Sequence, residues 1–118
     1  MTAAGDLRES VTFQRRVMVS DPYGNERGEW QDEFTCPARI KFLRGNETVV
    51  AARLQGQKVV AITIRAQPDA QGVTPAWRAY DTRKGLIDND PQTPARVFDL
   101  KVVEVDERAA WVNILAEE

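Results

Sequence analysis

The sequence predicts a mainly β protein, a small antiparallel β-barrel of five to six strands with one short helix between two strands. Several segments place apolar side chains at every second position, which is the period of a β-strand. Clusters of turn residues separate most of these segments by hairpin-length loops. Closure into a barrel is favoured because an open sheet of this size would leave two long edges exposed. With 118 residues, we expect one domain over residues 1–118.

Alternating apolar residues predict a first strand from about Ser10 to Val19. The chain then runs through Asp21-Pro22-Tyr23-Gly24-Asn25 and Gly28, which are turn-forming residues. We interpret residues 20–29 as a mobile hairpin loop that returns the chain at Trp30.

Residues 34–65 predict a strand, a short helix and another strand. The first of these strands places five apolar side chains on one face: Phe34, Cys36, Ala38, Ile40 and Phe42. Asn46 is a good N-cap and Gly56 is a typical C-terminal stop, so a helix of about ten residues is expected between them. A helix this short must pack on the strands it joins. Alternation then resumes, with one apolar row made of Val60, Ile62 and Ile64.

The rest of the chain predicts three further strands. Residues 67–72 are expected to form a loop, and residues 77–81 a short strand in which Trp77 and Ala79 face away from Arg78 and Tyr80. The polar, proline-broken residues 88–94 predict an exposed loop. Residues 97–105 are expected to be the longest strand, covered on both faces because both carry apolar residues. A last strand is expected from Ala110 to Ala116.

The composition restricts the chemistry. The chain has no histidine, and so lacks the usual general base, the partner of Ser–His and Cys–His pairs and the commonest transition-metal ligand. Cys36 lies on an apolar strand face, which favours a packed small side chain over a reactive thiol. The glycines are scattered and form no phosphate-binding loop. We therefore predict that the protein is not an enzyme and has no catalytic residue, cofactor or metal.

Two acidic stretches are candidates for a metal site: Asp88-Asn89-Asp90 and residues 29–33. Neither has the glycine and distant glutamate of a calcium-binding loop in register. Acidic residues are common in turns for conformational reasons alone, so a solvated loop is the favoured interpretation.

The charge balance limits the partners. Sixteen basic and eighteen acidic residues give a net charge of −2 and a pI of about 5.2, without the basic excess of tight nucleic-acid binders. The first residues include Asp6 and no apolar stretch, unlike a signal peptide, and one cysteine fits a reducing compartment. We expect a protein of the cytoplasm, or of an assembly built there, with no membrane partner.

Short sequence elements that match a known family follow one another in a fixed order along nearly the whole chain. They are Leu7-Arg8 before residues 11–15, Asp21 with Gly24, Trp30-Gln31-Asp32, Ala38-Arg39-Ile40, Leu43 with Gly45 and Glu47, residues 62–65, residues 74–78 and residues 111–118. This ordered set resembles the head–tail adaptor (head-closure, or stopper) proteins of long-tailed bacteriophages. The long, proline-rich stretch from Thr82 to Arg96 and the single Arg108 before the last tryptophan depart from the family pattern.

The resemblance implies a small β-barrel and a structural role in the virion. Copies would form a ring, hexameric or dodecameric, at the neck between the portal or adaptor protein and the tail terminator or tail tube. The ring would close the DNA channel and join head to tail, while double-stranded DNA passes without specific binding. The particle would be a phage, a prophage product or a gene-transfer particle, assembled in the bacterial cytoplasm.

Six charged residues are candidates for contacts with a neighbouring subunit: Arg44, Glu47, Arg53, Arg15, Arg39 and Arg65. The first three belong to residues 43–56, interpreted either as a flap facing the channel or the adjoining ring, or as a fixed crossover. The last three lie on outer strand faces, where they form either subunit contacts or a charged surface with weak ion pairs. The tryptophans fit either a core or a rim. An alternative function is a free-standing small-barrel module that binds a peptide or nucleic acid, which predicts a monomer with a concentrated basic or aromatic face.

Overall fold

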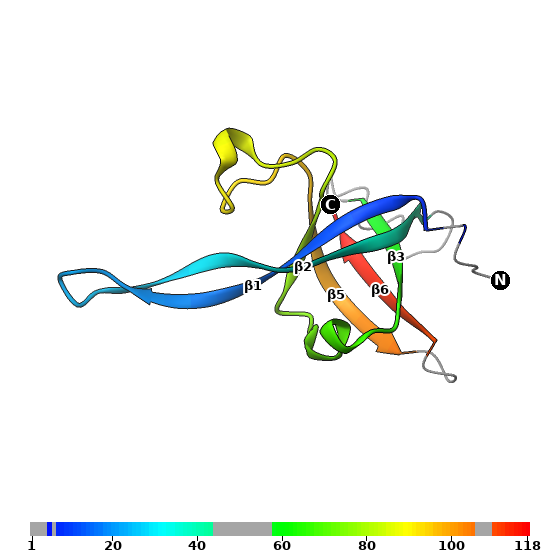
Figure 1. Cartoon of the computed structure of the whole chain (residues 1–118), viewed down its shortest axis with the longest axis horizontal. Coiled ribbons are helices and arrows are strands. Elements are labelled where there is room, and N and C mark those ends of the chain that lie inside the picture. The colour runs from blue at the N-terminus through cyan, green and yellow to red at the C-terminus, as the bar shows by residue number, and fades with distance from the viewer. Residues whose placement is uncertain (1–4, 6, 44–57, 106–109) are drawn as a thin grey trace.

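The computed structural model describes residues 5, 7–43, 58–105 and 110–118, and its six antiparallel strands close into one barrel (Figure 1). The strands are β1 (Glu9–Ser20), β2 (Glu26–Phe42), β3 (Val59–Arg65), β4 (Arg78–Asp81), β5 (Val97–Val105) and β6 (Trp111–Glu117). Their order around the barrel is β1-β2-β3-β6-β5-β4, and β4 pairs back with β1. The predicted mainly β barrel is therefore confirmed.

Alternate residues of each strand fill the barrel interior. The predicted row on β3, made of Val60, Ile62 and Ile64, is completely buried. The fully buried Phe13 of β1 stacks on the partly buried Phe34 of β2 with ring centroids 4.8 Å apart. The row on β2 is buried at Cys36 and Ala38, as predicted. Phe42, the last member of that row, is instead 45% exposed and lies beneath the guanidinium of Arg96.

β1 and β2 extend beyond the barrel as a two-stranded arm, which consists of residues 15–20 and 26–31 (Figure 1, blue and cyan). β4 pairs with β1 only at residues 11–14, and β3 pairs with β2 only at residues 38–42. The predicted loop over residues 20–29 is therefore wrong, since residues 26–29 belong to β2. The turn is shorter because the Asp21 carboxylate accepts hydrogen bonds from the amides of Tyr23 and Asn25, and Gly24 supplies a φ of 82°.

β5 has the predicted bounds but differs in two respects. It has 9 residues, against 12 in β1 and 17 in β2, so it is not the longest strand. A register shift between Leu100 and Val102 interrupts its alternation, and Val102 and Val105 are 40% and 59% exposed. The expected coverage of both faces is therefore wrong. The register shift turns Val102 toward solvent, whereas Val105 lies opposite the buried Val112 and is exposed because it ends the strand.

Smaller differences concern the other connections. β4 begins at Arg78, since Trp77 belongs to a turn in which its amide bonds to the Thr74 carbonyl. The last strand is shifted by one residue from the expected start at Ala110, and the expected loop at residues 67–72 contains a 3-10 helix, η2 (Pro68–Gly72). The predicted short helix falls within residues 44–57 and lies outside the described residues. In the described part of the chain, no helix has the length and apolarity to cross a membrane.

Candidate functional site at the base of the arm

The loop between β4 and β5, residues 82–96, folds over the base of the arm (Figure 1, yellow). It contains the 3-10 helix η3 (Ile87–Asn89) and is closed by a bridge between Leu86 and Pro94. Asp88 and Asn89 adopt φ values of 55° and 56°, a region that Asp and Asn tolerate better than most residues. The polar sequence of this loop therefore gives it a defined shape.

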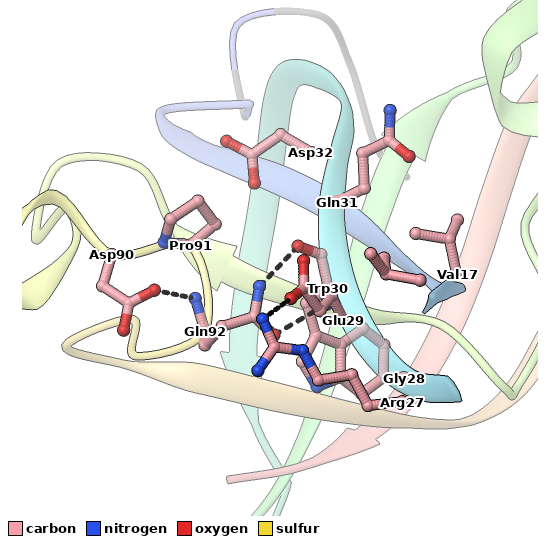
Figure 2. A pocket seen from close by; sticks show the side chains of 11 residues that line it. Val17, Arg27, Gly28, Glu29, Trp30, Gln31, Asp32, Asp90, Pro91 and Gln92 are labelled. Carbon is pink, nitrogen blue, oxygen red and sulfur yellow. Dashed lines mark hydrogen bonds and ion pairs between the residues drawn. The ribbon is translucent and has the colours of Figure 1, made fainter. Parts of the chain in front are cut away.

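The Gln92 side chain fastens the loop to β2 (Figure 2). Its Oε1 accepts the Trp30 amide N–H at 2.7 Å, and its Nε2 donates to the Trp30 carbonyl at 2.8 Å. This pair of bonds is the one that a strand residue makes with its neighbour, because a primary amide offers the same donor and acceptor as a peptide. The expectation that residues 88–94 form only an exposed loop is wrong at Gln92.

Gln14 connects β1 to the loop and to its neighbouring strands through side-chain hydrogen bonds. Its side chain is fully buried, and its Nε2 donates to the Asp32 carboxylate and to the Pro91 carbonyl, both at 2.8 Å. Its Oε1 accepts a 2.7 Å hydrogen bond from Arg78 Nε. All these polar atoms are therefore satisfied, which is the condition for burying an amide without a large cost.

Arg78 covers Trp30 and completes the connection. Its guanidinium carbon lies 4.3 Å from the Trp30 ring centroid, and its Nη2 donates to the carbonyls of Pro91 and Gln92, each at 3.2 Å. Burial lowers the pKa of Arg78, and the Asp99 carboxylate opposes this shift. The cation is held by ring and carbonyl contacts together.

Tyr80 supports Asp32 from β4. Its hydroxyl donates to the Asp32 carboxylate at 2.9 Å, and burial followed by this hydrogen bond raises the pKa of Tyr80. We call the following residues the brace: Gln14, Trp30, Asp32, Arg78, Tyr80, Pro91 and Gln92. The brace ties β1, β2, β4 and the loop to one another at the point where the arm leaves the barrel.

An open groove of about 880 Å³ runs beside the brace (Figure 2). It is lined by Val17 and Val19 of β1, residues 27–32 of β2 and residues 90–92 of the loop. The edge of a strand thus forms one wall and the loop forms the other. This geometry suits an extended polypeptide, which bonds to strand edges through its backbone.

The acidic residues considered as a metal site have local partners. The Asp90 carboxylate accepts the Gln92 amide at 3.0 Å, Glu29 pairs with Arg27 at 2.7 Å, and Glu33 pairs with Arg15 at 3.2 Å. Among the described residues, no group of three or more His, Cys, Asp and Glu could hold a metal ion. Cys36 is 5% exposed and burial raises its pKa to about 11, so it is a packed thiol at neutral pH, as predicted.

The candidate interface arginines do not converge on one point. Arg15 lies on the arm in its ion pair with Glu33. Arg39 lies opposite Thr63 on the barrel, two residues along β3 from Arg65, and Arg65 covers the Trp111 ring at 5.9 Å. The structure therefore brings Arg39 and Arg65 near each other and leaves Arg15 apart. Three other candidates lie outside the described residues: Arg44, Glu47 and Arg53.

Sequence reasoning missed the brace. One available signal was Gln14, a polar residue that directly follows the first apolar row; the structure buries four residues in succession from Val11 to Gln14. Another was the length of the loop after β4, since long loops in small domains commonly pack on the fold or carry function. Trp30, Trp77 and Trp111 are each partly buried, and Trp77 packs against the buried core.

Comparison with known families gives a clear result. The model of the phage head completion protein family matches residues 2–118. The chain belongs to this family. As a phage head completion protein it is a structural protein of the phage head, and its place is in the virion. The resemblance found in the sequence is thus confirmed at the level of the family.

The head completion fold recurs in solved structures. A chain from the virion of a native gene transfer agent particle has a TM-score of 0.57 and 20% identity, over 94% of this chain and 93% of that one. Protein SF1141 from Shigella flexneri 2a has a TM-score of 0.68 and 20% identity, over 99% of this chain and 96% of that one. At this identity the likeness concerns the fold alone. No curated protein matches the sequence.

Proposed function

We propose that copies of this head completion protein form a ring at the neck of the particle, between the portal or adaptor protein and the tail. There the ring closes the DNA channel and joins the head to the tail. The observation that carries this proposal is the family match over residues 2–118. The structure supports it with a closed barrel, which resists deformation, and an arm that reaches beyond it.

The charge of the chain suits a channel that DNA passes. A net charge of −2 lacks the excess of Lys and Arg that would neutralise phosphates and hold the duplex. DNA can then leave through the ring without specific binding.

Among the described candidate arginines, Arg39 is the best placed for a subunit contact. Arg15 is paired with Glu33 and Arg65 covers Trp111, whereas Arg39 makes no ion pair or ring contact within the described part of the chain. We expect Arg39→Ala to lower incorporation into particles with little effect on folding. Arg83→Ala is the matched control, since it removes an exposed arginine outside the arm whose charge is already paired with Glu9.

The proposal is tested with DNA-filled heads assembled without this chain. Adding the purified protein should increase DNA retention and allow purified tails to join, and electron microscopy should show added density at the portal vertex. Heads that keep their DNA and join tails equally well without the protein would refute the proposal. The alternative of a free-standing binding module predicts a monomer with no density on the heads.

A further inference from the structure

Both edges of the arm lack a strand partner. Beyond Gln14, β1 has no neighbour except β2, and before Ala38, β2 has no neighbour except β1. A two-stranded ribbon is marginally stable in water, and free strand edges readily pair with other chains. The arm also exposes large side chains, with Met18 65% and Tyr23 89% exposed. Such an element gains stability when another strand covers its edge.

The hydrogen-bonding register shows which backbone groups point outward. The Asp21 amide bonds to the Asn25 carbonyl at 2.8 Å, so this is a hydrogen-bonded pair. Bonded and non-bonded pairs alternate along an antiparallel ladder. The N–H and C=O groups therefore point away from the arm in the following cross-strand pairs: Ser20 with Glu26, Met18 with Gly28, and Arg16 with Trp30.

The contacts of Gln92 independently confirm this register. Gln92 bonds to both the N–H and the C=O of Trp30, which must therefore point outward from β2. The brace thus fills the edge at Trp30. The outward groups of Gly28 and Glu26 on β2, and of Met18 and Ser20 on β1, have no partner among the described residues.

We propose that the arms of neighbouring copies join edge to edge, with β2 of one copy pairing with β1 of the next. This inference rests on the proposed ring. Rotational symmetry points every arm in the same direction relative to the ring axis, and β1 and β2 of one arm run in opposite directions. Consequently β2 of each copy runs antiparallel to β1 of the next copy. The two free edges can then form the hydrogen bonds of an antiparallel ladder.

The side chains are compatible with this pairing. With arms at equal height, Gly28 of one copy faces Met18 of the next and Glu26 faces Ser20, each pair exchanging two hydrogen bonds. On β2 the pairing between copies ends at Gly28, because Gln92 already bonds to the outward N–H and C=O of Trp30. None of these pairs opposes two like charges. The occupant of each free edge is thus a second copy of this chain.

A proline substitution tests the edge without breaking the arm. Met18→Pro removes an N–H that points outward, so the ladder within the arm keeps its bonds, as for prolines on natural edge strands. Met18→Thr is the control, because it removes the same side chain and keeps the N–H. With the wild-type circular dichroism spectrum and melting temperature retained, we expect Met18→Pro to reduce the copies bound per head at least tenfold, and Met18→Thr to bind normally. Normal binding and tail joining by Met18→Pro would overturn the inference.

A cross-linking experiment tests the pairing even if Met18→Pro fails to fold. Two proteins, Ser20→Cys and Glu26→Cys, are mixed in equal amounts on the heads and treated with a short thiol cross-linker. Cys36 is buried with a raised pKa and should not react. We expect cross-linked pairs in the mixture and none with either protein alone. Pairs formed by one protein alone would indicate a twofold contact, and either that result or no cross-link would overturn the inference.

The two proposals fail in different ways. If the wild-type protein restores DNA retention and tail joining but the arm variants do so equally well without cross-links, the edge pairing is wrong and the neck function stands. If the wild-type protein neither binds heads nor restores these properties, the proposed function is wrong. The edge pairing, which depends on the proposed ring, is then wrong as well.

Discussion

The side chain of Gln92 forms a two-bond bridge with the backbone of Trp30, 62 residues away in the sequence, at 2.7 and 2.8 Å. A loop residue thereby takes the place of a strand residue at the edge of β2. The bridge satisfies two peptide groups that would otherwise be free and ends the exposed edge where the arm meets the barrel. It also fixes the loop after β4 against β2, with the Pro91 carbonyl held by Gln14.

Removing this bridge should loosen the loop and the edge together. We expect Gln92→Ala to destabilise the protein by about 1–3 kcal/mol, because two hydrogen bonds to a part-buried backbone are lost. Hydrogen exchange should show the Trp30 amide exchanging at least tenfold faster. Gln71→Ala, which truncates an exposed glutamine of η2, should change neither quantity. An unchanged Trp30 amide in Gln92→Ala would contradict the bridge.

Replacing Gln14 should have a larger effect on the brace. Gln14→Met keeps most of the volume but leaves Arg78 Nε, the Asp32 carboxylate and the Pro91 carbonyl without their central partner. We expect a loss of roughly 2–4 kcal/mol in urea unfolding, since three part-buried hydrogen bonds of the brace are lost at once. Gln31→Met on the exposed face of the arm is the matched control and should lose under about 0.5 kcal/mol. Equal stabilities of the two variants would mean that the brace is not structural.

Arg96 ties the end of the chain to the barrel. Its Nε and Nη2 contact the two Glu118 carboxylate oxygens at 2.8 and 3.2 Å, its Nη1 lies 3.5 Å from Asp81, and its guanidinium covers Phe98 at 4.9 Å. We expect Arg96→Met to lower the unfolding free energy by about 1–2 kcal/mol, because it leaves the buried Asp81 carboxylate without its cation. Glu118→Gln should cost less, since Asp81 keeps Arg96.

The control for that comparison is Arg83→Met. Arg83 lies 3.8 Å from Glu9 and donates a 2.6 Å hydrogen bond to the Arg8 carbonyl, and such exposed contacts contribute little. Thermal unfolding of the three variants should therefore rank Arg96→Met as least stable and Arg83→Met as closest to wild type. The reverse order would show that the Arg96 contacts do not stabilise the fold.

Alkaline pH should destabilise the protein through Cys36. Burial raises its pKa from 9.0 to about 11, so the folded state binds the thiol proton more tightly than the unfolded state. This contribution, about 2–3 kcal/mol, is fully present below pH 9 and is lost as pH rises through about 11. The pKa of Tyr80 is also raised, mainly by burial. The stability that its protonated hydroxyl contributes is therefore also lost as the pH rises above the pKa of tyrosine in the unfolded chain.

Urea unfolding of wild type and Cys36→Ala between pH 8 and 11 measures this effect. Cys36→Ala removes packing and should be destabilising at pH 8. The free energy of unfolding of this variant should, however, fall less steeply with pH than that of the wild type. We therefore expect the gap between the two proteins to narrow toward pH 11. Parallel curves would show that the thiol does not titrate differently in the two states.

The sequence by itself determined the β class, the barrel and the buried rows. Each depends on local information: alternation reports which side chains share a face, whatever strand lies beside them. For this reason the row on β3 and the buried Cys36 and Ala38 were predicted correctly. The ordered short elements likewise led to the correct family, since they need no knowledge of which strands meet.

Only the tertiary structure decided the length of the arm, the exposure of Val102 and the brace. Turn residues mark where a hairpin reverses but do not say how far pairing continues on either side, so residues 26–29 were assigned to a loop. The bulge in β5 depends on its pairing with β6. The bridge from Gln92 to Trp30 joins residues far apart in sequence, and its hydrogen bonds depend on loop geometry that no local pattern encodes.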